Sequence, residues 1–147
     1  MKKMISESFA RNGLLVLFSL FCLFHLLVLL GVIPFDIVWG GRLTNRQEML
    51  QMESVSLLLN LLMLAVVAVR AGRLPVRIPA KVITVILWLM VGLFALNTLG
   101  NLFSLNGFER AVFTPVTLLL SLFCLRLALE GASPAAPPLS AKRAKRL

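Results

Sequence analysis

His25 and Glu53 are the residues of this sequence that could carry acid–base chemistry. His25 is the only histidine of the 147-residue chain, and it lies between the apolar segments "LFCLF" and "LLVLL". Glu53 lies close to the start of a second apolar run. An imidazole and a carboxylate that meet in a medium of low dielectric can share or relay a proton, so both are candidate catalytic residues. A hydrogen-bonded packing role for His25 and an interfacial position for Glu53 near a helix N-terminus are the alternatives.

Further polar residues recur at helical spacing inside the apolar runs. They form four sets along the chain: Ser19, Cys22 and His25; Glu53, Ser56 and Asn60; Asn97 and Asn101; Thr114, Thr117, Ser121 and Cys124. We assign each set to one face of its helix, since residues three, four and seven positions apart are neighbours there. The sets together predict one polar seam along a bundle axis, which could form a pocket. In the alternative interpretation these side chains only hydrogen-bond between helices and hold the bundle together.

The segment "PFDIVWGGRLTNRQE", residues 34 to 48, is the polar stretch expected to cover the seam. Trp39 is a typical anchor at the membrane interface, and two adjacent glycines let the chain turn back. Asp36 and Arg42 would then stand at the mouth of a pocket, although a plain surface loop anchored by Trp39 is the alternative. The predicted ligand-binding residues are His25, Glu53, Asn60, Asn97, Asn101, Asp36, Trp39 and Arg42. We expect no metal and no cofactor, because metal-ligand clusters and nucleotide motifs are missing from the sequence.

The elements that must position these residues are four membrane-spanning helices. Apolar residues make up 59% of the chain and charged residues only 14%, against about 25% charged residues in soluble domains. Four apolar runs have the length of about 20 residues that a helix needs to cross a bilayer. The predicted spans are about 13–33, 50–70, 82–103 and 110–130. The first run is too long for a cleaved signal peptide and should remain in place.

The charged residues predict the orientation of these spans. Twelve of the 15 Lys and Arg residues lie before the first span, between the second and third, or at the C-terminal end. The positive-inside rule therefore predicts that both termini are cytoplasmic in the inner (plasma) membrane. The net charge of +9 is then explained by topology and by a Pro/Ala-rich basic tail, residues 132–147, which should lie on anionic headgroups. Nucleic acid is not an expected partner.

The connections between the spans predict the fold class. Short loops make neighbouring helices antiparallel, so we expect an all-α, up-down four-transmembrane-helix bundle within residues 1–131. Thr44 and Gln47 fit a capping box at the start of the second helix. The chain also resembles small four-span bacterial membrane proteins that are uncharacterised, through the segments "GVIPFDIVWGGRL" and "FALNTLGNLF". That resemblance implies four spans and no particular activity.

Three functions remain open on these observations. The favoured one is the binding of a small amphipathic or ionic ligand in an outward-facing polar pocket under the segment 34–48. The second is a non-catalytic accessory or scaffold subunit of a membrane complex, whose polar faces contact a partner protein or a second copy of the chain. The third is a membrane-embedded enzyme that uses His25 and Glu53 as acid and base. A binding protein or an enzyme needs the polar residues to converge within one chain, whereas an accessory subunit needs at least one polar face that points outward.

Overall fold

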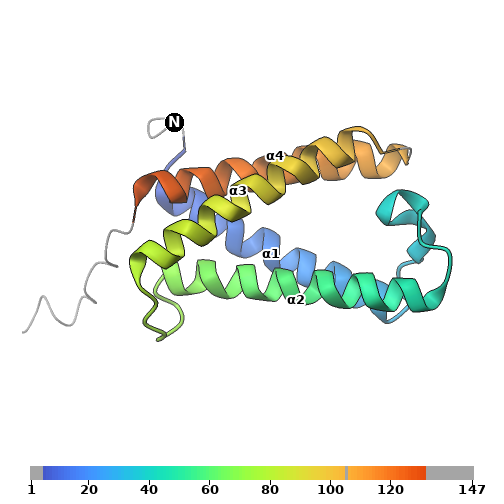
Figure 1. Cartoon of the computed structure of the whole chain (residues 1–147), viewed down its shortest axis with the longest axis horizontal. Coiled ribbons are helices and arrows are strands. Elements are labelled where there is room, and N and C mark those ends of the chain that lie inside the picture. Colours follow the sequence, from blue (N-terminus) through green and yellow to red (C-terminus); the bar gives the residue numbers. More distant parts are fainter. Residues whose placement is uncertain (1–4, 105, 132–147) are drawn as a thin grey trace, which may run out of the picture.

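The computed structural model describes residues 5–104 and 106–131, and the described residues are all-helical. The predicted basic tail, residues 132–147, lies outside the described residues. The elements in chain order are α1 (Glu7–Leu29), the short 3₁₀ helices η1 (Phe35–Ile37) and η2 (Trp39–Gly41), α2 (Arg46–Arg70), α3 (Ala80–Leu102) and α4 (Gly107–Glu130). Figure 1 shows that consecutive α-helices run in opposite directions.

All four α-helices are long and apolar enough to cross a membrane. They have 23 to 25 residues, which corresponds to about 35 Å of helix, and their most apolar windows have a mean hydropathy of 2.0 to 2.3. Only 11% of that window in α2 is buried inside the protein, and 22% in α1 and in α3. Leu58, Leu89 and Leu96 are among the many large side chains that remain exposed. Helices that expose this much apolar surface are consistent with a small multi-pass membrane protein.

The helices begin and end at local signals rather than at the limits of the apolar runs. Ser6 caps α1 by accepting a hydrogen bond from the Phe9 N–H at 3.1 Å. The helix therefore starts ahead of the apolar run that begins at residue 13. Gly31, with a φ of 74°, ends the same helix two residues after Leu29, so the last residues of the predicted span form a turn instead.

The predicted capping box of α2 is displaced by one residue. Asn45, and not Thr44, is the N-cap, and its side chain accepts a hydrogen bond from the Glu48 N–H at 2.9 Å. The Glu48 carboxylate in turn accepts from the N–H and the hydroxyl of Thr44, both at 2.9 Å. Glu48 thus takes the position that the sequence interpretation gave to Gln47, because the capping residue lies one position later in the chain.

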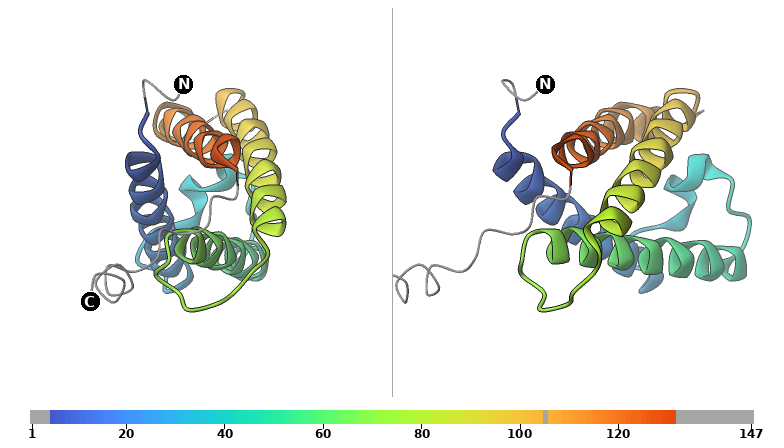
Figure 2. Two further views of the ribbon diagram at one scale, coloured as in Figure 1. Left: turned by 90° about the vertical axis from the view of Figure 1, so that its left-hand side faces the viewer. Right: turned by 60° about the vertical axis from the view of Figure 1, so that its left-hand side comes forward.

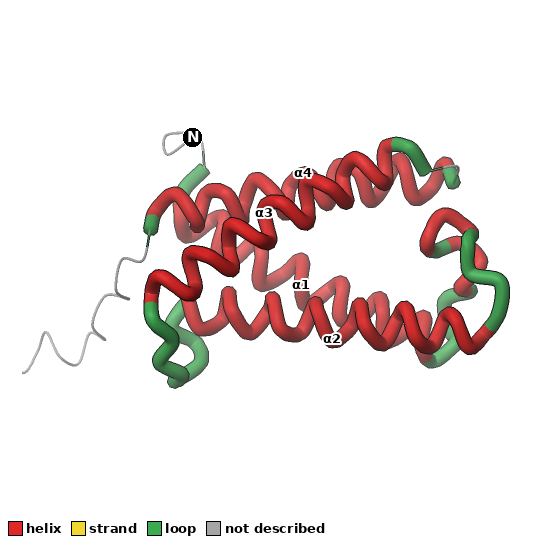
Figure 3. The backbone as a smooth tube through the Cα atoms, in the orientation of Figure 1, coloured by secondary structure: helices red, strands yellow, loops and turns green. Residues whose placement is uncertain are grey.

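The four α-helices form two hairpins, α1 with α2 and α3 with α4, which meet at one end and diverge at the other (Figures 1 and 3). The end at which they meet carries the basic loop 71–79 and the described chain ends, and we call it the basic end. The opposite end carries η1 and η2, and we call it the loop end. Figure 2 shows the four helices arranged in a ring when the basic end faces the viewer. The neighbouring helices of the two hairpins, α2 and α3, have little contact with each other.

The main hydrophobic core lies toward the basic end, where the hairpins meet. It consists of buried residues from all four helices, among them Leu14, Phe18, Val67, Leu87, Phe94, Leu120 and Phe123. Gly13 allows α1 to approach α4 closely, because a Cβ atom at this position would lie 2.4 Å from Cε2 of Phe123. Beside it, the rings of Phe9 and Phe123 pack edge to face with centroids 5.6 Å apart.

A set of polar contacts closes the basic end. Arg70 at the end of α2 forms an ion pair with Glu7 of α1 at 3.2 Å and donates to the carbonyl of Gly131 at 3.0 Å. Arg126 of α4 is buried, pairs with Glu130, and donates from Nε to the carbonyl of Ile5 at 2.7 Å. These arginines therefore hold chain ends together. From the sequence alone, they count only among the basic residues that predict the orientation of the spans.

Candidate functional site

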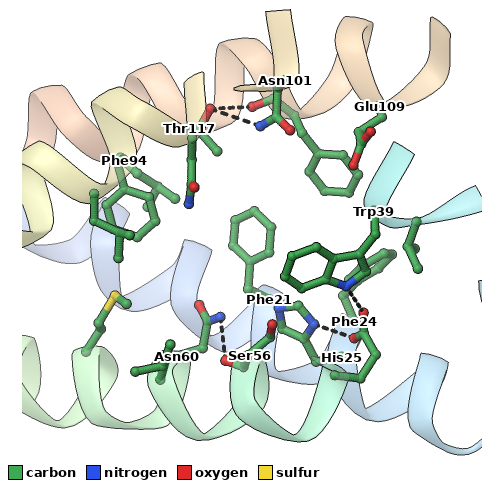
Figure 4. A pocket seen from close by; sticks show the side chains of 18 residues that line it. Phe21, Phe24, His25, Trp39, Ser56, Asn60, Phe94, Asn101, Glu109 and Thr117 are labelled. Carbon is green, nitrogen blue, oxygen red and sulfur yellow. Dashed lines mark hydrogen bonds and ion pairs between the residues drawn. The ribbon is translucent and has the colours of Figure 1, made fainter. Parts of the chain in front are cut away.

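A cavity of about 310 Å³ lies between the two hairpins, where they diverge toward the loop end. All four α-helices and the segment with η2 contribute to its wall. Its polar lining residues are His25, Trp39, Glu53, Ser56, Asn60, Asn97, Asn101, Glu109 and Thr117. Its aromatic lining residues, besides Trp39, are Phe21, Phe24, Phe94 and Phe113. Figure 4 shows these side chains around the open space. The volume is at the lower end of the range for small-molecule pockets.

Glu53 is the most deeply placed charged group of this cavity. Its side chain is 1% exposed, and both carboxylate oxygens have partners. Oε1 accepts from the indole N–H of Trp39 at 2.8 Å, and Oε2 lies 2.6 Å from Nδ1 of His25. Three separate elements, α1, η2 and α2, therefore meet at one carboxylate. Since a buried carboxylate without donors would cost several kcal/mol, about the desolvation penalty of one ion, these two contacts are what makes the position tolerable.

Trp39 reaches Glu53 from a strained backbone. Among the described residues it is the non-glycine residue with a positive φ, 56°, a conformation that L-residues other than Asn and Asp rarely adopt. The neighbouring Val38 is buried against Val28 and Met49, which holds this part of the segment on the ends of α1 and α2. The strain is of the order of 1–3 kcal/mol at such positions, and here it directs the indole toward Glu53.

His25 is held by both the carboxylate and two aromatic rings. Its side chain is 13% exposed, its ring stacks on Phe21 with centroids 6.4 Å apart, and Phe24 meets it edge-on at 5.7 Å. With Glu53 ionised, Nδ1 must carry the proton of their contact, because a carboxylate only accepts. Nε2 has no hydrogen-bond partner among residues 5–104 and 106–131. The imidazole is therefore fixed in position with one nitrogen committed to Glu53.

The opposite wall, from α3 and α4, has its own hydrogen bonds. The Thr117 hydroxyl accepts from Thr98 at 3.0 Å and from the Asn101 amide at 3.4 Å, and it donates to the Phe113 carbonyl at 2.8 Å. The Glu109 carboxylate accepts a short hydrogen bond from the hydroxyl of Ser104. In Figure 4 Asn101 and Glu109 lie across the open space from His25 and Asn60. The cavity thus has a carboxylate on each wall.

Two asparagines of the cavity are bound very differently. Asn60 donates its amide to the carbonyl of Ser56, one turn earlier in α2, at 2.9 Å. Asn97 is exposed, and its side chain has no hydrogen-bond partner within the described part of the chain. It lines both this cavity and an adjacent hollow. An amide at this depth of an apolar helix needs a polar partner, which water or a ligand in the cavity could supply.

Six of the eight predicted ligand-binding residues line the cavity, namely His25, Trp39, Glu53, Asn60, Asn97 and Asn101. Arg42 lines the adjacent hollow of about 570 Å³, which shares Trp39, Asn97, Asn101 and Glu109 with the cavity. Asp36 lines neither and instead borders a third hollow together with Arg46. The segment 34–48 therefore contributes Val38 and Trp39 to the cavity wall, whereas Arg42 lines only the adjacent hollow and Asp36 lines neither.

Two of the predicted polar stripes do not follow one cavity wall. Ser19 is exposed and donates to the carbonyl of Leu15 in its own helix, and Cys22 does not line the cavity. Two steps of three residues turn a helix by 600°, so Ser19 and His25 are about 120° apart and not on one face. On α4, Thr117 lines the cavity, whereas Ser121 donates to the Val91 carbonyl and Cys124 lies in the core. The part of that stripe with Ser121 and Cys124, nearer the basic end, therefore packs helices together.

Glu109 and the phenylalanines were missed in the sequence interpretation. Glu109 lies in the first turn of α4, and in the sequence it resembles an ordinary acidic residue at a helix N-terminus. Its spacing of four from Phe113 and eight from Thr117 places it on the cavity face, and this spacing was the available signal. Phe21 lies four residues before His25 and could have been found in the same way.

Comparison with protein-family models, with curated proteins and with solved structures found no match. The described residues hold no group of three or more His, Cys, Asp or Glu side chains that could bind a metal ion. Cys22 and Cys124 are free thiols. The chemical character of the cavity therefore depends on the Glu53 contacts, on Glu109, and on the aromatic rings around them.

Proposed function

We propose that the protein is an inner-membrane protein that binds a small amphipathic or ionic ligand in the cavity between its hairpins. The observation that carries this proposal is the buried Glu53, whose two oxygens are bound by His25 and Trp39 from two other elements. Placing three elements around one carboxylate beside an open space is costly for a bundle that needs only to be stable. Binding sites commonly combine an apolar wall with a few convergent polar groups of this kind.

The orientation in this proposal comes from the distribution of charge. Twelve of the 15 basic residues belong to the basic end or to the chain termini, which the positive-inside rule assigns to the cytoplasm. The cavity then opens in the outer half of the membrane, with η2 and its Trp39 at the outer surface. A ligand would reach it from the outer leaflet or from the external solution.

Native mass spectrometry of the protein, extracted from its own membrane with a mild detergent, tests the proposal. Ser56 lines the cavity, so Ser56→Trp should fill part of it and remove a co-purifying small molecule that the wild type carries. Leu58 is 58% exposed on the same helix and gives the matched control, because Leu58→Trp adds the same side chain outside the cavity. Equal small-molecule content in all three proteins would contradict the proposal.

The accessory-subunit alternative is supported by one separate observation. Asn97 is exposed without a partner on the side where α2 and α3 have little contact, and a helix of another protein could lie there. A cysteine at position 97 should then crosslink to another protein, or to a second copy, in native membranes. Under the ligand-binding proposal the same cysteine should react with small thiol reagents and form no crosslink.

The acid–base alternative uses the same contact between His25 and Glu53. That contact would allow a proton to move between Nδ1 and Oε2, but it commits both groups to each other. Substrate chemistry would have to begin at Nε2. We propose no reaction on this basis, and ligand binding is the function that these contacts support best.

A further inference from the structure

The cavity has an unusual charge for this chain. Its ionisable lining residues are Glu53, Glu109 and His25, and among the described residues that line it none is Lys or Arg. The sequence as a whole carries a formal net charge of +9. The cavity thus holds two carboxylates, and a single histidine could balance the charge of at most one of them, in a medium where charges interact strongly. A positively charged guest would compensate this charge.

Aromatic rings provide five of the ten apolar side chains that line the cavity. Phe113 of α4 contacts both Phe21 and Phe24 of α1, with ring centroids 6.1 and 5.7 Å apart. Trp39 adds an indole whose N–H is already bound to Glu53. Alkylated ammonium groups are attracted to surroundings that combine aromatic faces with carboxylates. The electron-rich ring faces attract the positive charge even when the ammonium group has no N–H to donate.

The cavity is also open to the side. Leu59 of α2 and Leu93 of α3 both line it, yet they are 45% and 38% exposed. The two helices that carry them, α2 and α3, have little contact with each other. Figures 1 and 3 show that these helices belong to the two hairpins that diverge toward the loop end. In a bilayer this opening faces acyl chains. A guest could therefore keep an apolar chain in the lipid while its polar head lies in the cavity.

We infer that the cavity binds an amphipathic organic cation, an alkylated ammonium group that carries one apolar chain. The head lies between Glu53 and Glu109 against the aromatic rings, and the chain leaves between α2 and α3. This inference rests on the proposed function and specifies the class of ligand. A purely anionic guest is disfavoured by the two carboxylates, and a fully apolar guest leaves them without compensation.

Trp39 provides the readout for a test with dodecyltrimethylammonium. The sequence has two tryptophans, and Trp88 is 47% exposed on α3, so Trp88→Phe leaves Trp39 as the single fluorophore at the cavity. The full chain is studied in dodecyl maltoside micelles, which already present a neutral twelve-carbon amphiphile. We expect the cation to change Trp39 emission saturably at a low mole fraction, and neutral dodecyl glucoside to produce no such change.

Charge variants test whether the carboxylates are responsible. Glu53→Gln and Glu109→Gln should each weaken binding of the cation by about tenfold or more, as expected for the loss of a poorly solvated charge contact. Asp36→Asn removes an acid from the same end of the molecule without touching the cavity wall, and it should leave the affinity unchanged. Glu109→Gln serves as the decisive variant if Glu53→Gln fails to fold.

The outcomes separate this inference from the proposed function. An affinity for the cation no greater than for dodecyl glucoside, or one that survives both glutamine substitutions, overturns the cationic ligand. If a small molecule still co-purifies with the wild type and is lost in Ser56→Trp, the binding proposal stands without it. If the native protein also carries no such molecule, both the inference and the proposed function are contradicted.

Discussion

Nδ1 of His25 lies 2.6 Å from Oε2 of Glu53, although the two residues are 28 positions apart in the chain. The contact joins α1 to α2 in the wall of the cavity. The second oxygen of the same carboxylate binds the Trp39 indole, so one side chain fixes the loop end to the helices. Most of the testable consequences of the structure follow from this carboxylate and from the close packing at the other end.

The first prediction concerns the proton on His25. A carboxylate offers an acceptor to both His25 and Trp39, whereas a glutamine at position 53 has one acceptor oxygen and one donor group. If that oxygen serves the indole, the amide N–H₂ faces His25, whose Nδ1 must then accept. We expect Nδ1 to carry the proton in the wild type and Nε2 to carry it in Glu53→Gln. The ¹⁵N chemical shifts of the single histidine report this directly.

Identical nitrogen shifts in the two proteins would contradict the contact between His25 and Glu53. Glu48→Gln is a suitable control, because Glu48 is on the same helix but accepts its hydrogen bonds from Thr44. It should leave the histidine spectrum as it is in the wild type.

The second prediction concerns the indole of Trp39. Trp39→Phe removes the donor to Oε1 of the buried Glu53 and keeps a large aromatic side chain. Leaving one oxygen of a buried carboxylate unpaired should lower the free energy of unfolding by about 1–3 kcal/mol. The measurement is unfolding by sodium dodecyl sulfate in mixed micelles, followed by circular dichroism.

Trp88→Phe is the matched control for that experiment. Trp88 is 47% exposed on α3 and has no hydrogen bond within the described residues, so the same substitution should change the free energy of unfolding little. If both variants lost the same stability, the effect would belong to the size of the ring and not to the hydrogen bond.

The third prediction concerns the close approach of α1 and α4. Gly13→Ala would place a methyl group 2.4 Å from Cε2 of Phe123, and the aromatic ring or the helices must then shift. We expect a loss of about 1–3 kcal/mol in the free energy of unfolding, which is the usual cost of overpacking a core. Gly13→Ala combined with Phe123→Leu should recover part of that loss.

Gly92→Ala tests the same chemical change where there is space. Nothing lies within 4 Å of a Cβ atom at this position of α3. Alanine favours the helix by about 0.5–1 kcal/mol over glycine, so this variant should be as stable as the wild type or slightly more stable. Destabilisation by both substitutions to the same extent would argue against a specific contact at Gly13.

The fourth prediction concerns orientation. In a background without Cys22 and Cys124, single cysteines are placed at three exposed apolar positions, Val32 and Phe103 at the loop end and Val76 at the basic end. These positions avoid the capping residues Asn45 and Asn106, whose side chains bind backbone N–H groups. A membrane-impermeant thiol reagent added to intact cells should label positions 32 and 103 but not 76. The reverse pattern would invert the proposed topology.

Sequence alone was sufficient for the number of long α-helices, although not for the short 3₁₀ helices η1 and η2. Apolar runs of about 20 residues are local features, and a chain that has them must satisfy its backbone groups within helices if it lies in a bilayer. The i, i+3 and i+7 spacing also placed Glu53, Ser56 and Asn60 on one face of α2, and all three line the cavity. This prediction succeeded because periodicity within a helix depends only on its geometry. The ends of the helices were less well predicted, since caps such as Asn45 depend on which of two adjacent residues takes the capping position.

Tertiary structure decided which of the polar residues meet. Whether the face of α1 with His25 and Phe21 or the face with Ser19 lines the cavity depends on the rotation of α1 about its axis, which is set by packing around Phe18 and Leu14. The pairing of Trp39 with Glu53 required a backbone conformation that no propensity favours for tryptophan. Glu109 joined the site because α4 packs along α3 and its Phe113 contacts Phe21 and Phe24 of α1, which brings the first turn of α4 into the cavity wall. These relationships arise from contacts between residues that are distant in the chain. A local pattern can indicate which residues share a helix face, but it does not decide which faces meet.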